Sequence, residues 1–450
     1  MIGVGGIGLS AIARVLAARG IQVTGCDMGA SELTRSLAAA GIPVTVGHGA
    51  GHLEGVELVV VSSAIPESNS EVVAARRAGI PVVHRRELLA LMMRGVDGIA
   101  VAGTAGKTTT SAMVAHILVE LGHDPTYIVG GLSPDLHGNA AAGQSRWFVL
   151  EADEYDHAFE DLQPYVGLVT NIEMDHPDCF ADIAAVRAAF AVFMAHVRAD
   201  GWLVVGADSP EARRAVAEAD PAARVVWFGE AGDANCRMSD VRVRRGGGVA
   251  FRWTHREHGT IPVALQVPGA HNALNATAAM AATICCGVDP AAAAEALGRF
   301  QGVARRFEIK GERDGVMVVD DYAHHPTKIR ATLAAARARY PERRIVALFQ
   351  PHTYSRTAAL LDEFAVCFDD ADLVRLVDIF PARPSERATI SSRELAAAVQ
   401  HGDVAYVGDL QRASERLREE LRPGDLLITL GAGNGFLVGE SFLAGREVSP

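Results

Sequence analysis

The sequence predicts an α/β protein of three domains, which we place at residues 1–96, 97–303 and 304–450. The first reason is length, because a chain of 450 residues exceeds the roughly 100–200 residues that one domain usually holds. The second is that short β-branched runs alternate with alanine-rich helical stretches, which is typical of parallel sheets covered by helices. Hydrophobic residues make up 49% of the chain and charged residues 21%, so each domain has enough apolar side chains for a core.

The first domain opens on a glycine-rich turn, Gly3–Gly8, which an alanine-rich helical stretch follows. Ile21–Gly25 has the pattern of a strand and is followed by Asp27, and this order indicates a Rossmann-like domain. Because only Met1 and Ile2 precede the turn, we expect a chain truncated at its start, with the first strand nearly absent.

The central domain begins with a buried-strand pattern at Gly98–Ala102, which runs into a second glycine-rich turn. Helices, strands and loops then alternate, as expected of a P-loop-type ATPase domain with a mostly parallel sheet. Residues 235–267 differ, because their short alternating runs predict a small antiparallel sheet. The third domain repeats a doubly wound, Rossmann-like pattern. Its expected strands are Val316–Val319, Arg344–Phe349, Leu373–Asp378 and Leu426–Thr429.

Charge and cysteine content argue against several classes of protein. The 54 acidic and 42 basic residues give a net charge of −12, which repels nucleic acid, so we expect no nucleic-acid partner. The six cysteines show no C-x-x-C spacing, which predicts reduced thiols in a cytoplasmic enzyme. No signal peptide and no apolar run of transmembrane length is evident, so we expect no membrane association.

The glycine-rich turn of the central domain is a candidate phosphate loop spanning Gly103–Thr110. Glycines let backbone N–H groups approach a phosphate closely, and the N-terminus of the following helix favours negative charge. Lys107 can reach phosphate oxygens, and Thr108 can place its hydroxyl on magnesium. Val101 stands where the full G-x-x-x-x-G-K-[ST] pattern has its first glycine, so the loop is a shorter variant. The alternative is a glycine turn with a surface lysine.

Acidic and histidine residues follow two predicted strands of the same domain. Glu151 comes directly after the strand Phe148–Leu150, and His176 follows the strand Val166–Thr170. Neighbouring strand ends would place both side chains beside the phosphate loop, where magnesium neutralises phosphate charge. Each acidic run taken alone could equally be a solvated turn.

Three further polar clusters follow predicted strands or open predicted helices. Asn272 and Asn275 lie three residues apart, so they share one helix face and could pair with a purine edge, although helix capping explains them equally well. A second cluster joins Arg305, Arg306, Asp320, Asp321, Tyr322, His324 and His325. We favour nucleotide contact over metal binding for this cluster, because no third ligand has suitable spacing. The third cluster holds His352 and Arg356, which could recognise an amino acid or a phosphate or could simply belong to a capped helix start.

The first glycine motif also fits a dinucleotide fingerprint, G-x-G-x-x-G with Asp27 about twenty residues further on. An NAD-dependent oxidoreductase is therefore an alternative. We do not favour it, because it would require two unrelated nucleotide sites in one chain.

Taken in order along the whole chain, these motifs resemble the Mur ligases of peptidoglycan synthesis. Within that family the resemblance is strongest to the members that add alanine to a UDP-linked sugar acid. The segments that carry it are Gly3–Gly8, Ser62–Pro66, Gly138–Ala140, Asp320–Pro326 and Phe349–Thr357. The resemblance implies ATP-dependent ligation of L-alanine to UDP-N-acetylmuramate through an acyl phosphate, with Mg²⁺ as cofactor and a monomer or weak homodimer as the active form.

The resemblance also implies roles for individual residues. ATP contact falls on Gly103, Thr104, Ala105, Gly106, Lys107, Thr108, Thr109, His271, Asn272, Asn275, Arg305 and Asp321. UDP-sugar contact falls on Gly5, Gly6, Ile7, Ser62, Ser63, Ala64 and Asn139. Amino-acid contact falls on His325, His352, Tyr354 and Arg356, and the metal ligands are Thr108, Glu151 and His176. The catalytic set is Lys107, His176, Glu151 and Arg356.

The chain departs from the family pattern at three positions. Ala105 stands where the loop usually has histidine, and we expect tolerance because a backbone N–H contacts the phosphate there. Arg187 falls roughly where many relatives have a lysine, carbamylated in some, and arginine cannot carry that modification. Tyr155 replaces a serine common in alanine-adding members and matches the related murein tripeptide-recycling ligase, which is the nearest alternative. A non-catalytic nucleotide-binding module and a ligase of folate or cyanophycin type are less favoured.

Overall fold

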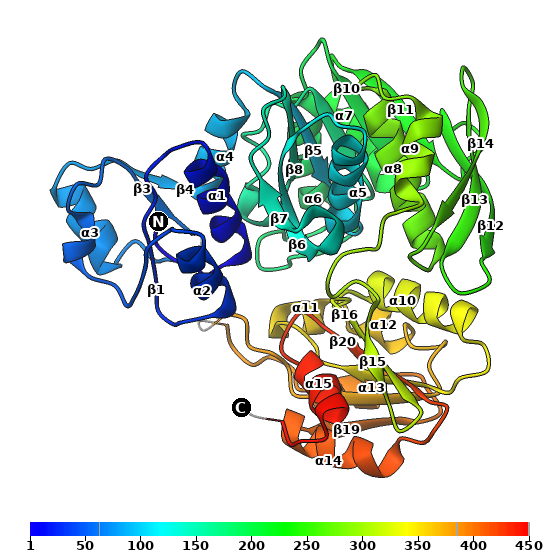
Figure 1. The fold of residues 1–450 in the computed structure, drawn as a ribbon. Coiled ribbons are helices and arrows are strands. Elements are labelled where there is room, and N and C mark those ends of the chain that lie inside the picture. Colours follow the sequence, from blue (N-terminus) through cyan, green and yellow to red (C-terminus); the bar gives the residue numbers. More distant parts are fainter. Residues whose placement is uncertain (63, 384–385, 449–450) are drawn as a thin grey trace.

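The protein, seen in a computed structural model, consists of three α/β domains (Figure 1). The structure describes residues 1–62, 64–383 and 386–448. The N-terminal domain lies against one side of the central domain, and the C-terminal domain lies below both in the view of Figure 1. The predicted fold class is confirmed, while the predicted domain limits remain a prediction.

The N-terminal domain contains two parallel strand pairs joined by a single residue. Strands β1 (Gly25–Asp27) and β2 (Val44–Val46) form one pair, and β3 (Val59–Val61) and β4 (Val82–His84) form the other. Ile2 forms parallel bridges to both Cys26 and Val61, so this one residue takes the place between β1 and β3 that the first strand of the domain would occupy. The helices of this domain are α1 (Ile7–Ala18), α2 (Glu32–Ala39), η1 (Ala50–Leu53), α3 (Ser70–Arg77) and α4 (Arg85–Met93).

The central domain is built on one ten-stranded sheet with the order β14-β13-β12-β11-β10-β9-β5-β8-β6-β7. The strands are β5 (Asp97–Ala102), β6 (Thr126–Ser133), β7 (Gly138–Ala141), β8 (Trp147–Glu151), β9 (Val166–Val169), β10 (Trp202–Gly206), β11 (Arg224–Gly229), β12 (Cys236–Val243), β13 (Val249–His255) and β14 (Gly259–Leu265). The antiparallel strands expected in residues 235–267 are present as β12–β14. They extend the parallel sheet, because β12 pairs with β11, and so do not form a sheet of their own.

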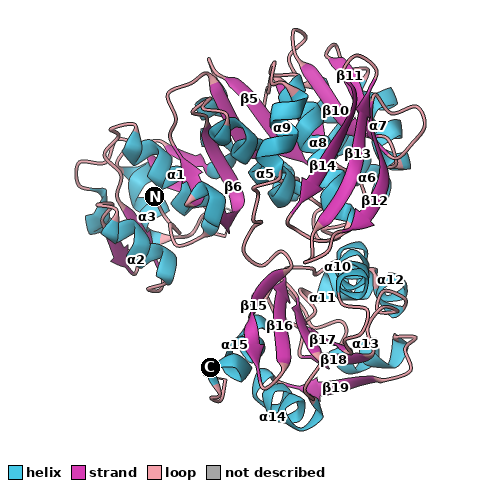
Figure 2. Cartoon of the chain, turned by 45° about the vertical axis from the view of Figure 1, so that its right-hand side comes forward, coloured by secondary structure: helices cyan, strands magenta, loops and turns pink. Residues whose placement is uncertain are grey.

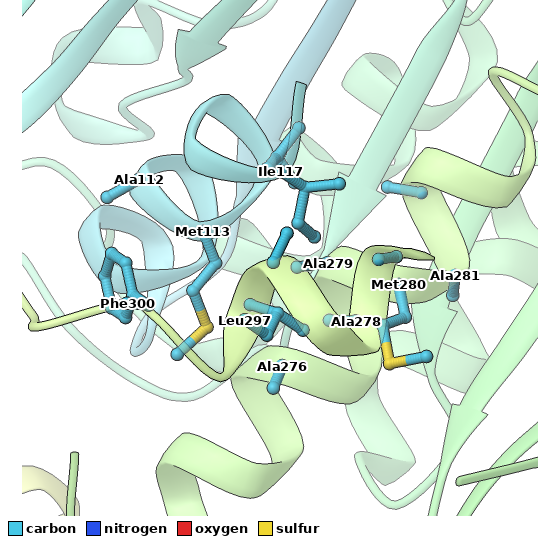
Figure 3. Close-up of a cluster of buried hydrophobic side chains, with 14 of the residues drawn as sticks. Ala112, Met113, Ile117, Ala276, Ala278, Ala279, Met280, Ala281, Leu297 and Phe300 are labelled. Atoms are coloured by element: carbon cyan, nitrogen blue, oxygen red, sulfur yellow. The ribbon is translucent and has the colours of Figure 1, made fainter. Parts of the chain in front are cut away.

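Alanine-rich helices pack closely on one another beside this sheet. Helix α8 (Ala270–Ile284) packs against α5 (Lys107–Glu120) and α9 (Pro290–Leu297), and small alanines share this cluster with Met113 and Leu297 (Figure 3). Small side chains let helix backbones approach, which holds the N-termini of α5 and α8 side by side. The remaining helices are η2 (Pro134–Leu136), η3 (Tyr155–His157), α6 (Ile183–Ala195) and α7 (Pro210–Ala219).

The C-terminal domain has a six-stranded sheet with the order β15-β16-β20-β17-β18-β19. Its strands are β15 (Glu308–Arg313), β16 (Val316–Asp321), β17 (Ile345–Phe349), β18 (Leu373–Val377), β19 (Val404–Gly408) and β20 (Leu426–Leu430). All neighbours except β15 and β16 run parallel, so the strand ends after β16 and β17 share one edge. Its helices are α10 (Pro326–Arg339), α11 (Tyr354–Ala359), α12 (Leu361–Ala365), α13 (Ser392–Ala398), α14 (Leu410–Glu420) and α15 (Phe436–Ala444).

The edge of the C-terminal sheet at which β16 and β17 end faces the central domain, and α10 is the helix of this domain that contacts α8 of the central domain (Figure 2). Among the described residues, no helix combines the length and apolar character that crossing a bilayer requires.

Candidate active site

The phosphate loop lies between the end of β5 and the start of α5, as predicted. Gly103 has a φ of +133° and Gly106 a φ of +87°, which are conformations that favour glycine. A Cβ on Gly103 would meet Thr170, and one on Gly106 would meet Asn275. Gly106 is the N-cap of α5 and supplies no side-chain oxygen, so the first N–H groups of the helix remain open to an anion.

Lys107 points into a carboxylate cluster next to this loop. Its ammonium lies 2.6 and 2.8 Å from the two carboxylate oxygens of Glu154 and 2.6 Å from the carbonyl oxygen of Gly103. Burial by itself lowers the pKa of Lys107, but the carboxylates of Glu154 and Asp153 outweigh it and raise that pKa. Burial raises the pKa of Glu154 to about 7, against the opposing effect of Lys107. Lys107 is therefore a charged group that a phosphate can share.

Glu151 contacts the phosphate loop from the neighbouring strand β8. The hydroxyl of Thr108 donates to Glu151 Oε1 at 3.0 Å, and the N–H of Gly130 donates to Oε2 at 2.7 Å. This proximity follows from the sheet, because Glu151 pairs in register with Val101 on β5. The predicted magnesium ligands Thr108 and Glu151 are thus brought together.

His176 lies in the same cluster, after strand β9. Its Nε2 is 3.7 Å from Glu154 Oε1, and its buried Nδ1 has no hydrogen-bond partner among the described residues. Burial lowers its pKa to about 4, so the imidazole is neutral and keeps a free lone pair at neutral pH. An imidazole with a free nitrogen in a cluster of carboxylates, beside the Thr108–Glu151 pair, is a set of groups that fits a divalent cation.

A pocket of about 380 Å³ opens from the phosphate loop toward the C-terminal domain. The predicted ATP contacts Ala105, Gly106, Thr108, Thr109, His271, Asn272, Asn275 and Asp321 line it. The other predicted ATP contacts, Gly103, Thr104, Lys107 and Arg305, do not line it. Burial and the nearby Arg306 lower the pKa of His271 to about 4, which leaves a neutral ring at the pocket wall.

Arg306, and not Arg305, supplies the guanidinium of this pocket. Arg306 lines it and donates to the hydroxyl of Thr108 at 3.1 Å. Arg305 instead donates to Asp320 at 2.8 Å and to the carbonyl of Gly431 at 2.9 Å. In this structure the guanidinium of Arg305 is turned into the C-terminal domain, and its contact with the nucleotide stays a prediction.

The predicted amino-acid contacts gather where the C-terminal domain meets β9. Arg356 is 3% exposed and donates from Nε to Asp175 at 2.7 Å, while His352 Nδ1 accepts from Nη1 of Arg356 at 3.2 Å. His325 donates from Nε2 to the carbonyl of Met174 at 3.0 Å. The N–H of Tyr354 donates to Glu386 at 3.2 Å. These residues join two domains, and their contact with an amino acid stays a prediction.

The predicted UDP-sugar contacts lie at the junction of the first two domains. The N–H of Gly5 donates to Asp27 Oδ2 at 2.8 Å, and the side-chain amide of Asn139 donates to the carbonyl of Ile7 at 3.3 Å. Asp27 is thus occupied by the glycine turn, whereas an NAD site would need it for a ribose. Gly6 is exposed beside them.

The second predicted sugar segment lies across the end of β3. The N–H of Ala64 donates to the hydroxyl of Ser62 at 3.4 Å. A Cβ on Gly3 would lie 3.2 Å from that of Ser62, so this segment and the glycine turn are neighbours. Ser63 lies outside the described residues.

Sequence reasoning did not assign roles to three residues of this site. They are Glu154, Asp175 and Lys328. Glu154 and Asp175 stand inside the acidic runs that follow β8 and β9, but their partners are 47 and 181 residues away, so no local signal could separate them from their neighbours. Lys328 lines the pocket from α10 and had no signal of its own.

Comparison with known proteins assigns this three-domain nucleotide-loop architecture to a class. Residues 1–96 match the Mur ligase family catalytic domain, residues 101–283 the Mur ligase middle domain, and residues 305–433 the Mur ligase glutamate ligase domain. The chain belongs to the Mur ligase family, as its motifs predicted.

Individual relatives cover almost the whole chain. It is 42% identical to the UDP-N-acetylmuramate–L-alanine ligase of Geobacter sulfurreducens over 99% of this chain and 97% of the relative. It is 45% identical to the protein of the same name from Rubrobacter xylanophilus over 99% of both. The solved UDP-N-acetylmuramate–alanine ligase of Thermotoga maritima superposes with a TM-score of 0.81 at 28% identity, covering 99% of this chain and 97% of that one. A murein peptide ligase from Psychrobacter arcticus, at 23% identity, has the same fold, with a TM-score of 0.75 and coverage of 98% and 97%.

Proposed function

We propose that this enzyme joins L-alanine to UDP-N-acetylmuramate with hydrolysis of ATP to ADP and phosphate, as a step of peptidoglycan precursor synthesis. The observation that carries the proposal is the convergence of Lys107, Glu151 and His176 on one phosphate loop that opens into a pocket between two domains. The likeness to alanine-adding relatives over almost the whole chain supports the choice of substrates. We place the enzyme in the cytoplasm, as a monomer or weak homodimer.

Phosphoryl transfer comes first in the proposed reaction. The muramyl carboxylate attacks the γ-phosphorus of ATP, ADP leaves, and an acyl phosphate forms. The amides at the start of α5 and the ammonium of Lys107 hold the phosphate oxygens and stabilise the charge that develops on them. Arg306, which reaches Thr108 from the start of the C-terminal domain, adds positive charge beside the phosphate loop.

Amide formation follows. The amine of alanine attacks the acyl carbonyl, phosphate leaves, and the amine loses its proton. The acyl phosphate must be protected from water during this step, and the pocket between the central and C-terminal domains can provide that protection. Closure of the C-terminal domain is supported by the buried Asp175–Arg356 pair, which already joins the two domains.

Magnesium is the cofactor that this site fits. Thr108, Glu151 and His176 would hold it, because the hydroxyl of Thr108 and the carboxylate of Glu151 meet beside the phosphate loop, and the imidazole of His176 lies in the adjoining cluster. When bound, the ion neutralises phosphate oxygens and so favours transfer.

One observation favours an alternative acceptor, a tripeptide in place of alanine. By the sequence resemblance, Tyr155 is the residue expected in murein tripeptide-recycling ligases, and its ring lies 5.1 Å from that of His176 and 4.9 Å from the guanidinium carbon of Arg383. A larger acceptor than alanine, such as a tripeptide, would therefore meet an aromatic side chain close to the chemistry.

Phosphate release separates these candidates. The purified full chain receives ATP, magnesium and UDP-N-acetylmuramate, with L-alanine or the L-alanyl-γ-D-glutamyl-diaminopimelate tripeptide in separate reactions. We expect phosphate release that depends on both the sugar nucleotide and alanine, with a product one alanine heavier by mass spectrometry. Release with the tripeptide alone would establish the second candidate, and release with neither would overturn both.

A further inference from the structure

A cluster of metal-binding side chain types lies in the N-terminal domain, outside the nucleotide site. Cys26 is in β1, His48 is in the loop after β2, and Glu71 is in the first turn of α3. Cys26 is 4% exposed and Glu71 is 1% exposed, so two of the three groups are removed from water. Cys26 and His48 are 22 residues apart in the sequence, and His48 and Glu71 are 23 apart. The fold thus brings the thiol and the imidazole to one buried carboxylate.

The three donor atoms are spaced for a common metal ion. Cys26 Sγ lies 3.4 Å from His48 Nδ1 and 2.9 Å from Glu71 Oε2, and His48 Nδ1 lies 3.6 Å from the same oxygen. A tetrahedral zinc ion with ordinary bond lengths requires donors about 3.3–3.6 Å apart. The two distances from His48 already match this range. The shorter S–O distance fits direct donation of the thiol proton to the carboxylate, a contact that opens when the proton leaves.

The carboxylate of Glu71 is held in place through its other oxygen. Glu71 Oε1 accepts from the N–H of Gly49 at 2.8 Å and contacts His52 Nδ1. This leaves Oε2 directed at Cys26 and His48. Among the described residues, no lysine or arginine side chain pairs with Glu71, and the cationic groups near it are His48, His52 and the N-terminal ammonium of Met1. A buried carboxylate is costly unless positive charge balances it, and a bound cation would add to that balance.

We propose that Cys26, His48 and Glu71 bind one zinc-like divalent ion, with His52 orienting the carboxylate. The thiolate and imidazole select zinc over magnesium, which prefers oxygen ligands alone. Binding replaces the thiol proton, which passes to solvent. The side chains of His48, which is 11% exposed, and His52, which is 33% exposed, are the members of the group that solvent reaches, so the ion would enter from their side.

The position of this cluster gives the ion a mechanical role. The carbonyl of Cys26 accepts the N–H groups of Gly3 and Val4 at 2.9 and 3.1 Å, and the next residue, Asp27, accepts the N–H of Gly5. An ion bound to Cys26 would therefore tie β1 and α3 together directly beneath the first glycine turn. Metal loading should raise the thermal stability of the full chain.

Cobalt spectroscopy tests the proposal with the full chain, freed of metal by a chelator. Co²⁺ bound by a thiolate gives a charge-transfer absorption that the oxygen-rich phosphate-loop site cannot produce. We expect one equivalent of Co²⁺ per chain to give this absorption, zinc to displace it, and Cys26→Ser to abolish it. His48→Gln should weaken Co²⁺ binding by at least about 10-fold. The control Cys285→Ser changes the C-cap residue of α8, in the central domain, and should leave the spectrum unchanged.

Three outcomes would overturn the proposal. The first is an absence of cobalt–thiolate absorption in the wild type, which would leave the cluster as a hydrogen-bonded network only. The second is an absorption that survives Cys26→Ser or disappears in Cys285→Ser. The third is wild-type affinity in His48→Gln, which decides the matter if Cys26→Ser does not fold.

Discussion

The guanidinium of Arg356, in α11 of the C-terminal domain, donates to the carboxylate of Asp175, which follows β9 of the central domain, at 2.7 Å. Both side chains are 3% exposed. Burial alone would raise the pKa of Asp175, but Arg356 and His176 hold it well below its usual range. Asp175 is therefore a charged, buried link between the domain that binds the nucleotide and the domain that must close on it.

Breaking this link should loosen the closed arrangement. Asp175→Asn leaves the Arg356 charge buried without a counter-charge, which typically costs about 3–5 kcal/mol. We expect a lower urea midpoint and a lower kcat. The surface variant Arg416→Gln, whose side chain is 55% exposed, serves as control and should keep both values. Wild-type stability in Asp175→Asn would show that the pair does not hold the domains together.

Lys107 should be required for phosphoryl transfer. Lys107→Ala removes the ammonium beside the phosphate loop, and loss of one charge-stabilising group typically costs about 10²–10³-fold in kcat. Phosphate release that depends on UDP-N-acetylmuramate measures it. Lys310→Ala removes a lysine whose partners, Glu308 and Glu440, lie in the C-terminal domain, and should keep activity near normal. Equal activity in the two variants would contradict the assignment of Lys107.

Gly106 should tolerate no side chain, for two separable reasons. Its φ of +87° costs about 1–2 kcal/mol for another residue, and its Cβ would meet Asn275 at the start of α8. Gly122 has a φ of +74° with open space around it, so Gly122→Ala reports the backbone cost alone. We expect Gly106→Ala to lose more stability than Gly122→Ala, and also to lose binding of a fluorescent ATP analogue. Similar results for both would show that the contact with Asn275 is unimportant.

Substituting Arg306 should weaken ATP binding, whereas substituting its neighbour Arg305 should lower the stability of the fold. Arg306→Ala removes a pocket side chain, so KM for ATP should rise while the unfolding midpoint changes little. Arg305→Ala leaves the buried Asp320, which is 2% exposed, without its cation, and should lower the midpoint. Steady-state kinetics and urea unfolding of both variants decide between the roles, and the opposite pattern would restore Arg305 as the nucleotide contact.

His271 should make stability depend on pH. Burial, aided by Arg306, lowers the pKa of His271 in the folded protein to about 4, whereas a free histidine has a pKa of about 6.5. Between these values the unfolded chain binds more protons than the folded one, so stability falls as pH drops from about 6.5 toward 4. His271→Gln should flatten the slope of unfolding free energy against pH in this window. An unchanged slope would show that the ring is not buried in its neutral form.

Local sequence patterns determined the three α/β domains, the phosphate loop and the polar residues at the strand ends. A glycine turn between a buried strand and a helix has one favourable geometry, and adjacent parallel strands bring their ends to one edge. Glu151 therefore meets Thr108 as expected, because β8 is the neighbour of β5. The antiparallel segment was also predictable from the sequence. The pairing of β12 with β11, which makes this segment an extension of the main sheet, was not.

Tertiary structure decided the partners of the charged groups. Arg305 and Arg306 are adjacent and chemically identical, yet one turns to Asp320 and the other to Thr108, 198 residues away. Glu154 and Asp175 acquire their roles only because Lys107 and Arg356 are brought to them by other elements. The sequence by itself determined which groups stand at each strand end, since that depends on backbone patterns a few residues long. Which of those groups pair was decided only by the packing of domains, because burial makes an ion pair specific and burial is set by segments distant in the chain.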